Sequence, residues 1–103
     1  MKTENSGIVH IVLFRWNEDA TPEAIAAAVE ALRGLKDTVP NILDLSVGEN
    51  FSDRAKGYHH ALVVRFPDRA ALEAYGPHPG HQYVVQNFTN PIRADVLAFD
   101  YEI

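Results

Sequence analysis

Two segments of this sequence, Ile8–Trp16 and residues 58–66, are apolar at both odd and even positions. Both are rich in β-branched and aromatic residues, which is typical of β-strands. Side chains of a strand alternate between the two faces of its sheet, so a strand of this composition is buried on both sides. The chain must therefore fold around a sheet whose two faces are both covered.

A helix is expected after the first strand. Thr21, Pro22 and Glu23 supply an N-cap, a proline at the first helical position and an early acidic side chain. The apolar residues that follow recur at helical spacing along one stripe, which predicts that one face of the helix lies on a core. They are Ile25, Ala28, Val29, Leu32 and Leu35.

Two further strands are expected. Residues 42–47 alternate between apolar and polar, as in a half-exposed strand, and residues 96–101 form the last apolar run. Between the strand at 42–47 and the strand at 58–66, the polar residues 48–57 predict a loop.

A second helical region is expected after residue 66. Asp68 caps a short helix that reaches Tyr75, residues 76–80 are too rich in glycine and proline to be helical, and the helix resumes over residues 81–88. The resulting order is β-α-β-β-α-β, the ferredoxin-like α+β arrangement. All 103 residues are expected to form a single domain, with residues 1–6 flexible.

The helices of this fold cover only one face of the sheet. The other face would be bare and apolar, which soluble monomers rarely tolerate over a large area. We therefore expect a homodimer in which two sheets close face to face, as a dimeric α+β barrel with room for a ligand between them.

Two histidines interrupt apolar sides of the strands, and we assign both to the bare face. His10 lies within the first strand and His60 within the third. A buried imidazole without partners costs roughly 1–3 kcal/mol, so each must be hydrogen-bonded, exposed to water or lining a cavity. A satisfied core histidine is the simpler interpretation of either residue taken alone.

The segment from Tyr75 to His81 (YGPHPGH) is the third candidate feature. Its prolines and glycines set His78 and His81 in a fixed turn, where a neutral imidazole can accept a proton and a tyrosine can donate one. A helix-breaking turn whose histidines make capping contacts explains the pattern equally well. The chain has no cysteine, and no acidic cluster lies beside this segment, so we expect neither a metal site nor a cofactor.

Charge and hydropathy exclude two classes of partner. The net charge of −5, with scattered basic residues, argues against nucleic acid. No apolar stretch approaches the roughly 20 residues of a membrane helix, and no signal-like segment is present, so we expect a cytoplasmic protein.

Five segments in order resemble the stress-responsive A/B barrel family, Dabb. They begin at His10, Ile42, Gly57, Tyr75 and Asp95 (HIVLF, ILDLSVGEN, GYHHALVV, YGPHPGH and DVLAFDY), and the resemblance spans about residues 8–101. The resemblance implies a ferredoxin-like protomer and a dimeric barrel. The family includes stress-induced proteins without a clear reaction, olivetolic acid cyclase, which acts by aldol condensation, and a hydroxynitrile lyase.

Carried over by motif, the cyclase resemblance implies catalytic roles for Tyr75 and His81, and substrate-binding roles for His10, His60 and His78. The sequence departs from the cyclase at Gly76-Pro77, where the cyclase has two apolar residues, and at Gly80, where it has alanine. We therefore carry two hypotheses: a lyase or aldol-type cyclase that uses acid–base catalysis on a small carbonyl compound, and a non-catalytic stress-responsive or ligand-binding dimer. A third hypothesis, a monooxygenase on a related dimeric fold, rests on topology alone.

Overall fold

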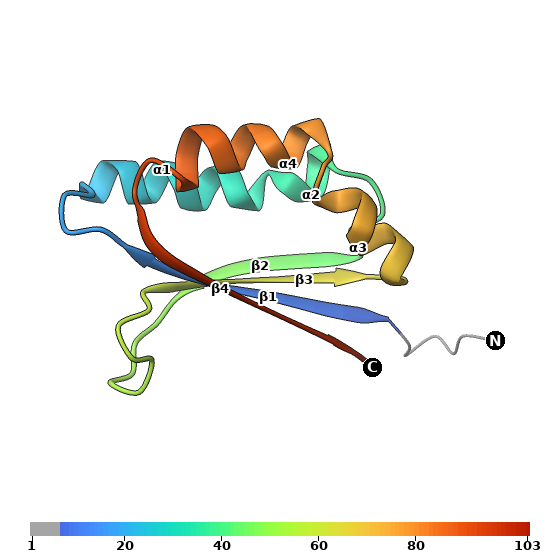
Figure 1. Ribbon diagram of the computed structural model, residues 1–103, viewed down its shortest axis with the longest axis horizontal. Helices are drawn as coiled ribbons and strands as arrows, with labels where there is room; N and C mark the ends of the chain where they lie inside the picture. Colours follow the sequence, from blue (N-terminus) through green and yellow to red (C-terminus); the bar gives the residue numbers. More distant parts are fainter. Residues whose placement is uncertain (1–6) are drawn as a thin grey trace.

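The computed structural model describes residues 7–103, which form a four-stranded antiparallel sheet with its helices packed on one face (Figure 1). The sheet order β2-β3-β1-β4 confirms the ferredoxin-like prediction. The prediction that residues 1–6 are flexible lies outside the described part. In chain order the elements are β1 (Ile8–Trp16), α1 (Pro22–Arg33), α2 (Leu35–Thr38), β2 (Asp44–Glu49), β3 (His60–Phe66), α3 (Arg69–Tyr75), α4 (Pro79–Val84), the π-helical η1 (Val85–Thr89) and β4 (Arg93–Glu102).

Helix α1 forms as its sequence predicts. The Thr21 hydroxyl accepts a hydrogen bond from the Ala24 amide at 3.1 Å, which caps the first turn. Ala28, Val29 and Leu32 are buried from one face of the helix, against the sheet. None of the helices in residues 7–103 is long and apolar enough to cross a membrane.

The strand register decides which residues share a face. In the β1–β3 pair, His10 lies opposite Val64 and Phe14 lies opposite His60, so both histidines are on the same face. That face is the one under the helices, because its neighbours Val12, Leu62 and Val64 belong to the core with α1. Our assignment of His10 and His60 to the bare face is therefore wrong. Both strand parities are apolar, and the sequence pattern cannot tell which one the helices cover.

The face away from the helices is apolar too, as predicted, but it is built from the other set of residues. Its exposed side chains are on β4, where Leu97 is 48%, Phe99 60% and Tyr101 49% accessible. These residues pair with the odd-numbered positions of β1, namely Leu13, Ile11 and Val9. No described helix or strand covers this face of the sheet, although the loop between β2 and β3 lies on the same side (Figure 1).

The second helical region differs from its prediction. Helix α4 begins at Pro79, two residues before the expected start, because proline suits the first turn of a helix. The helix then widens into η1, where the Asn90 amide donates to the Val85 carbonyl at 2.8 Å. Such single π-turns are frequent at functional sites. Strand β2 begins two residues later than predicted, and β4 begins three residues earlier.

Candidate active site

Tyr75 and His81 meet because a tight turn joins α3 to α4. Helix α3 is capped by the Asp68 carboxylate, which accepts from the Ala71 amide at 2.9 Å, and it ends at Tyr75. The chain then turns into α4, which carries His81 in its first turns. The two rings lie with their centroids 4.2 Å apart. The sequence singles out both residues, and the structure places their rings in contact.

The hydroxyl of Tyr75 is buried and has no hydrogen-bond partner among residues 7–103. The side chain is only 3% accessible, and its ring packs edge-on against Phe66 and His10, with centroids 5.1 and 5.7 Å away. Burial raises the pKa of Tyr75 well above its ordinary value, so the phenol keeps its proton. Burying a hydroxyl without a partner costs free energy, and a hydrogen bond from this hydroxyl to a ligand oxygen would recover part of that cost.

A hydrogen bond to the backbone determines which ring nitrogen of His81 is basic. Its Nδ1 lies 2.9 Å from the Gly76 carbonyl oxygen. A carbonyl oxygen only accepts hydrogen bonds, so Nδ1 carries the hydrogen and Nε2 keeps the lone pair. Burial lowers the pKa of His81, while the hydrogen bond to Gly76 opposes this shift. The ring is therefore neutral near pH 7, with a basic nitrogen available.

His10 is held by a carboxylate that the sequence analysis missed. Its Nδ1 is hydrogen-bonded to an oxygen of Asp100, which lies directly opposite it in the β1–β4 register. The His10 side chain is 13% accessible and that of Asp100 45%. The alternation of Val96, Ala98 and Asp100 along β4 was the available signal, because it places an acid on the helix-covered face.

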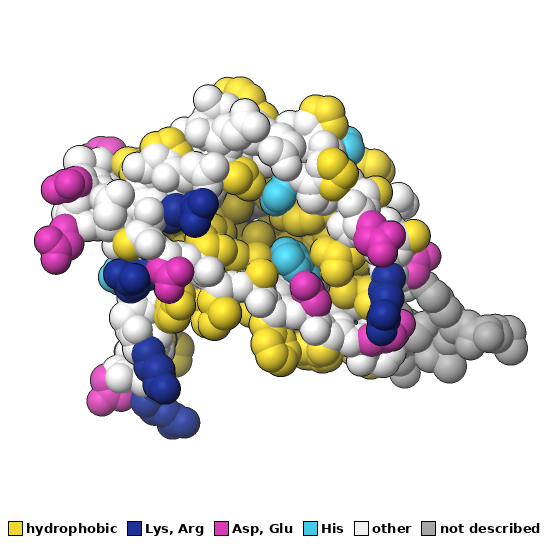
Figure 2. Space-filling model, in the orientation of Figure 1, with side chains coloured by type: hydrophobic (Ala, Val, Ile, Leu, Met, Phe, Trp, Pro, Cys, Tyr) yellow, Lys and Arg dark blue, Asp and Glu magenta, His cyan; other side chains and the backbone are white. Residues whose placement is uncertain are grey.

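His10, Tyr75 and His81 line one cavity of about 400 Å³ between the helices and the sheet. Val12, Phe14 and Leu62 from the sheet, with residues of α1, η1 and β4, supply mostly apolar walls. Figure 2 shows this hollow with apolar side chains inside it and histidines at its edges. The volume is near the lower end of those typical for small-molecule sites. The space lies under the helices of one protomer, and not between two sheets as expected.

His60 and His78 lie outside this cavity. The Gly80 amide donates to His78 Nδ1 at 3.0 Å, so His78 caps α4, as the capping interpretation predicts. Trp16 donates its indole N–H to His60 Nδ1 at 3.0 Å. Burial lowers the pKa of His60. His60 is thus a hydrogen-bonded histidine beneath the helices.

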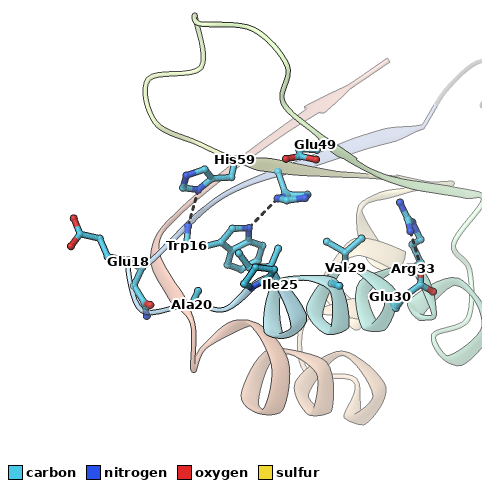
Figure 3. Close-up of a pocket in the computed structure, with 13 residues that line it drawn as sticks. Trp16, Glu18, Ala20, Ile25, Val29, Glu30, Arg33, Glu49 and His59 are labelled. Atoms are coloured by element: carbon cyan, nitrogen blue, oxygen red, sulfur yellow. Dashed lines mark hydrogen bonds and ion pairs between the residues drawn. The ribbon is translucent and has the colours of Figure 1, made fainter.

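His60 lines a second, larger cavity of about 700 Å³ that shares no lining residue with the first. Figure 3 shows Trp16 at its centre, with Ile25 and Val29 of α1 on one side and His59 on the other. The Trp16 amide donates to His59 Nδ1 at 3.1 Å. Within residues 7–103, no group of three or more histidine, cysteine, aspartate or glutamate side chains is arranged to hold a metal ion.

The comparisons with known proteins agree with this architecture. A family model described as the stress responsive A/B barrel domain matches residues 8–103. The chain belongs to the stress-responsive A/B barrel family, Dabb. The stress-response A/B barrel domain-containing protein DABB1 of Arabidopsis thaliana is 30% identical to it over 100 residues, which cover 94% of this chain and 47% of DABB1. The Dabb chain thus spans about half the length of this curated relative.

Solved structures share the fold. A dimeric ferredoxin-like protein of unknown function from Thermobifida fusca is 28% identical, with a TM-score of 0.84 over 100% of this chain and 96% of its own. The hydroxynitrile lyase of Passiflora edulis is 21% identical, with a TM-score of 0.85 over 94% of this chain and 93% of its own. At that identity the likeness to the lyase shows the fold alone.

Proposed function

We propose that this Dabb protein binds a small carbonyl compound in the His81 cavity and acts on it by acid–base catalysis, as a lyase or an aldol-type cyclase. The observation that carries the proposal is the pairing of His81 with Tyr75. A neutral imidazole whose Nε2 keeps its lone pair lies beside a buried phenol whose hydroxyl has no partner among the described residues. One group can accept a proton, and the other can stabilise the negative charge that forms.

In the proposed step, His81 Nε2 removes a proton from the carbon next to the substrate carbonyl. The electron pair of the broken C–H bond forms an enolate, and the Tyr75 hydroxyl donates a hydrogen bond to its oxygen. In a cyclase, the enolate carbon then attacks a second carbonyl of the same molecule and forms a C–C bond, and the imidazolium returns its proton to the resulting alkoxide. His10, fixed by Asp100 beside Tyr75, forms the third polar wall of the site.

The protein is proposed to work as a homodimer through the bare face of its sheet. Leu97, Phe99 and Tyr101 expose an apolar stripe on β4, next to the apolar odd-numbered residues of β1. Such a face favours association with an identical face across a two-fold axis. The relative from Thermobifida fusca is described as dimeric, which supports a dimer for this chain.

The catalytic proposal is tested by proton exchange. The protein is incubated in D₂O with a panel of small ketones and aldehydes, and loss of the α-proton NMR signal is followed. We expect exchange with at least one compound, slowed by about 10²–10⁴-fold in His81→Ala. His59→Ala is the matched control, because His59 is an exposed histidine at the other cavity.

The competing function is non-catalytic ligand binding in the same cavity. Exchange that is equally fast in the wild type and in His81→Ala would overturn the enzyme proposal and favour this alternative. Shifts of the His10 and His81 NMR signals that reach a plateau as a panel compound is titrated, without any α-proton exchange, would also favour non-catalytic binding.

A further inference from the structure

The His81 cavity has one permanent charge among its described lining residues, and that charge is positive. Arg93 lies at the start of β4 and lines the cavity together with His10 and His81, while no carboxylate does. This is unexpected in a chain whose net charge is −5. A lone cation in a mostly apolar cavity attracts an anionic group of a ligand.

An irregularity of the sheet directs Arg93 to this position. Arg15 pairs with Asp95, but the next residue of β1, Trp16, pairs with Arg93, so β4 holds one extra residue, Ala94. In a regular strand Ala94 would lie opposite Trp16, and Arg93 would be on the face away from the helices. The bulge therefore moves Arg93 to the helix-covered face, and bulges beside active sites often re-aim a side chain in this way.

The terminal amino groups of Arg93 are available for a ligand. Its Nε donates to the Asn90 side-chain oxygen at 2.7 Å, which fixes the plane of the guanidinium. No ion pair or further side-chain hydrogen bond with another described residue occupies its two Nη groups. A guanidinium held in this way matches the two oxygens of a carboxylate.

We propose that Arg93 binds the carboxylate of the substrate, so that the substrate class is a small carbonyl compound that also carries a carboxylate. This inference rests on the proposed function, because it assigns a substrate class to the same cavity. The hydrocarbon part of the ligand lies along the apolar walls around Phe14 and Leu62, and its carbonyl oxygen reaches Tyr75. A single cation suits a carboxylate monoanion better than a phosphate dianion, which usually recruits several donors.

The inference is tested by binding alone, without turnover. Three probes of similar shape are titrated into ¹⁵N-labelled protein: 3-phenylpropionate, its neutral amide 3-phenylpropionamide, and 2-phenylethyl phosphate. We expect the carboxylate to shift the signals of His10 and His81, and to bind about tenfold more tightly than the amide, as expected for a charged hydrogen-bonded contact. The phosphate is expected to bind no better than the carboxylate.

Substitutions at Arg93 test whether this residue causes the preference for the carboxylate over the amide. Arg93→Met should remove the carboxylate preference, and Arg93→Lys should retain part of it. Arg54→Met is the matched control, because it removes the same charge from an exposed loop position outside the cavity, and it should leave the preference unchanged. Thermal melting of each variant checks that the fold is retained, which is expected because Arg93 is exposed.

Four results would overturn the inference: equal affinity for carboxylate and amide, a preference that survives in Arg93→Met, tighter binding of the phosphate, or no binding of any probe up to its solubility limit. Failure of the proposed reaction is recognised separately. Without α-proton exchange but with an intact carboxylate preference, the catalytic role of His81 fails while the Arg93 contact is supported. His81→Ala should keep the preference, since His81 does not touch the carboxylate.

Discussion

The imidazole of His81 packs against the ring of Tyr75, with centroids 4.2 Å apart, while its Nδ1 is committed to the carbonyl of Gly76. The two side chains come from successive helices that are separated by only a short turn. Their relative position is thus set by local backbone geometry. The tyrosine hydroxyl is buried and unpaired within the part of the chain that the structure describes.

Tyr75→Phe should separate stability from activity. The substitution removes a buried hydroxyl without a partner, so the free energy of unfolding should stay unchanged or rise by up to about 1 kcal/mol. The α-proton exchange rate should fall by at least about tenfold. Urea unfolding and NMR exchange measure the two effects. A loss of more than about 1 kcal/mol would mean that the hydroxyl is hydrogen-bonded in the folded protein.

Acid should destabilise the protein through two half-buried histidines, His60 and His81. Burial lowers the folded-state pKa of both His60 and His81, so below the ordinary value of about 6.5 the unfolded chain binds their protons more readily than the folded one. The free energy of unfolding should therefore fall as the pH drops through this value. Urea midpoints at about pH 8 and about pH 5 test the effect. The difference between the two midpoints should shrink in His60→Gln, whose amide oxygen can still accept a hydrogen bond from Trp16. A midpoint that does not depend on pH would contradict the prediction.

Asp100→Ala should release His10 rather than unfold the protein. The carboxylate is 45% accessible, so its loss should cost less than about 1 kcal/mol of stability. The ¹⁵N shifts of the His10 ring should change, because Nδ1 loses its acceptor. Glu102→Ala is the control, as Glu102 lies on the same strand and pairs with Arg69 instead. Unchanged His10 ring shifts in Asp100→Ala would refute the contact.

Phe99→Asp should produce monomers. Phe99 is 60% accessible on the bare face of β4, and a charge there would be buried between two sheets. Sedimentation equilibrium should show a dimer for the wild type and a single protomer for the variant. Tyr83→Asp serves as the matched control, because Tyr83 is 62% accessible but belongs to α4. A wild-type chain that stays monomeric at high concentration would contradict the proposed dimer.

The strands and the order of elements could be predicted because they depend on local patterns. The Thr21 cap, the stripe on α1 and the apolar strands each act over a few residues. The Tyr75–His81 contact is also local, because only a short turn separates the two helices that carry these residues. The covered face of the sheet was not, because β1 is apolar at both parities and only the packing of distant helices selects one of them.

The remaining polar residues of the site depend on pairings across the sheet. Asp100 reaches His10 from 90 residues away, through the β1–β4 register. Arg93 reaches the cavity through a bulge. Beyond a bulge, the odd and even positions of a strand exchange faces, so alternation counted from the sequence assigns them to the wrong side. The alternation along β4 indicates only that Asp100 shares a face with Val96 and Ala98, whereas its pairing with His10 and the position of Arg93 depend on the register between β1 and β4.

The stacking of Trp16 has a practical consequence for experiments. It is the sole tryptophan of the chain, it stacks on Phe14 with centroids 5.1 Å apart, and its indole N–H is donated to His60. Because a protonated imidazole quenches indole emission, intrinsic fluorescence will report the charge of His60. The same signal will register occupancy of the larger cavity, with no label added to the molecule.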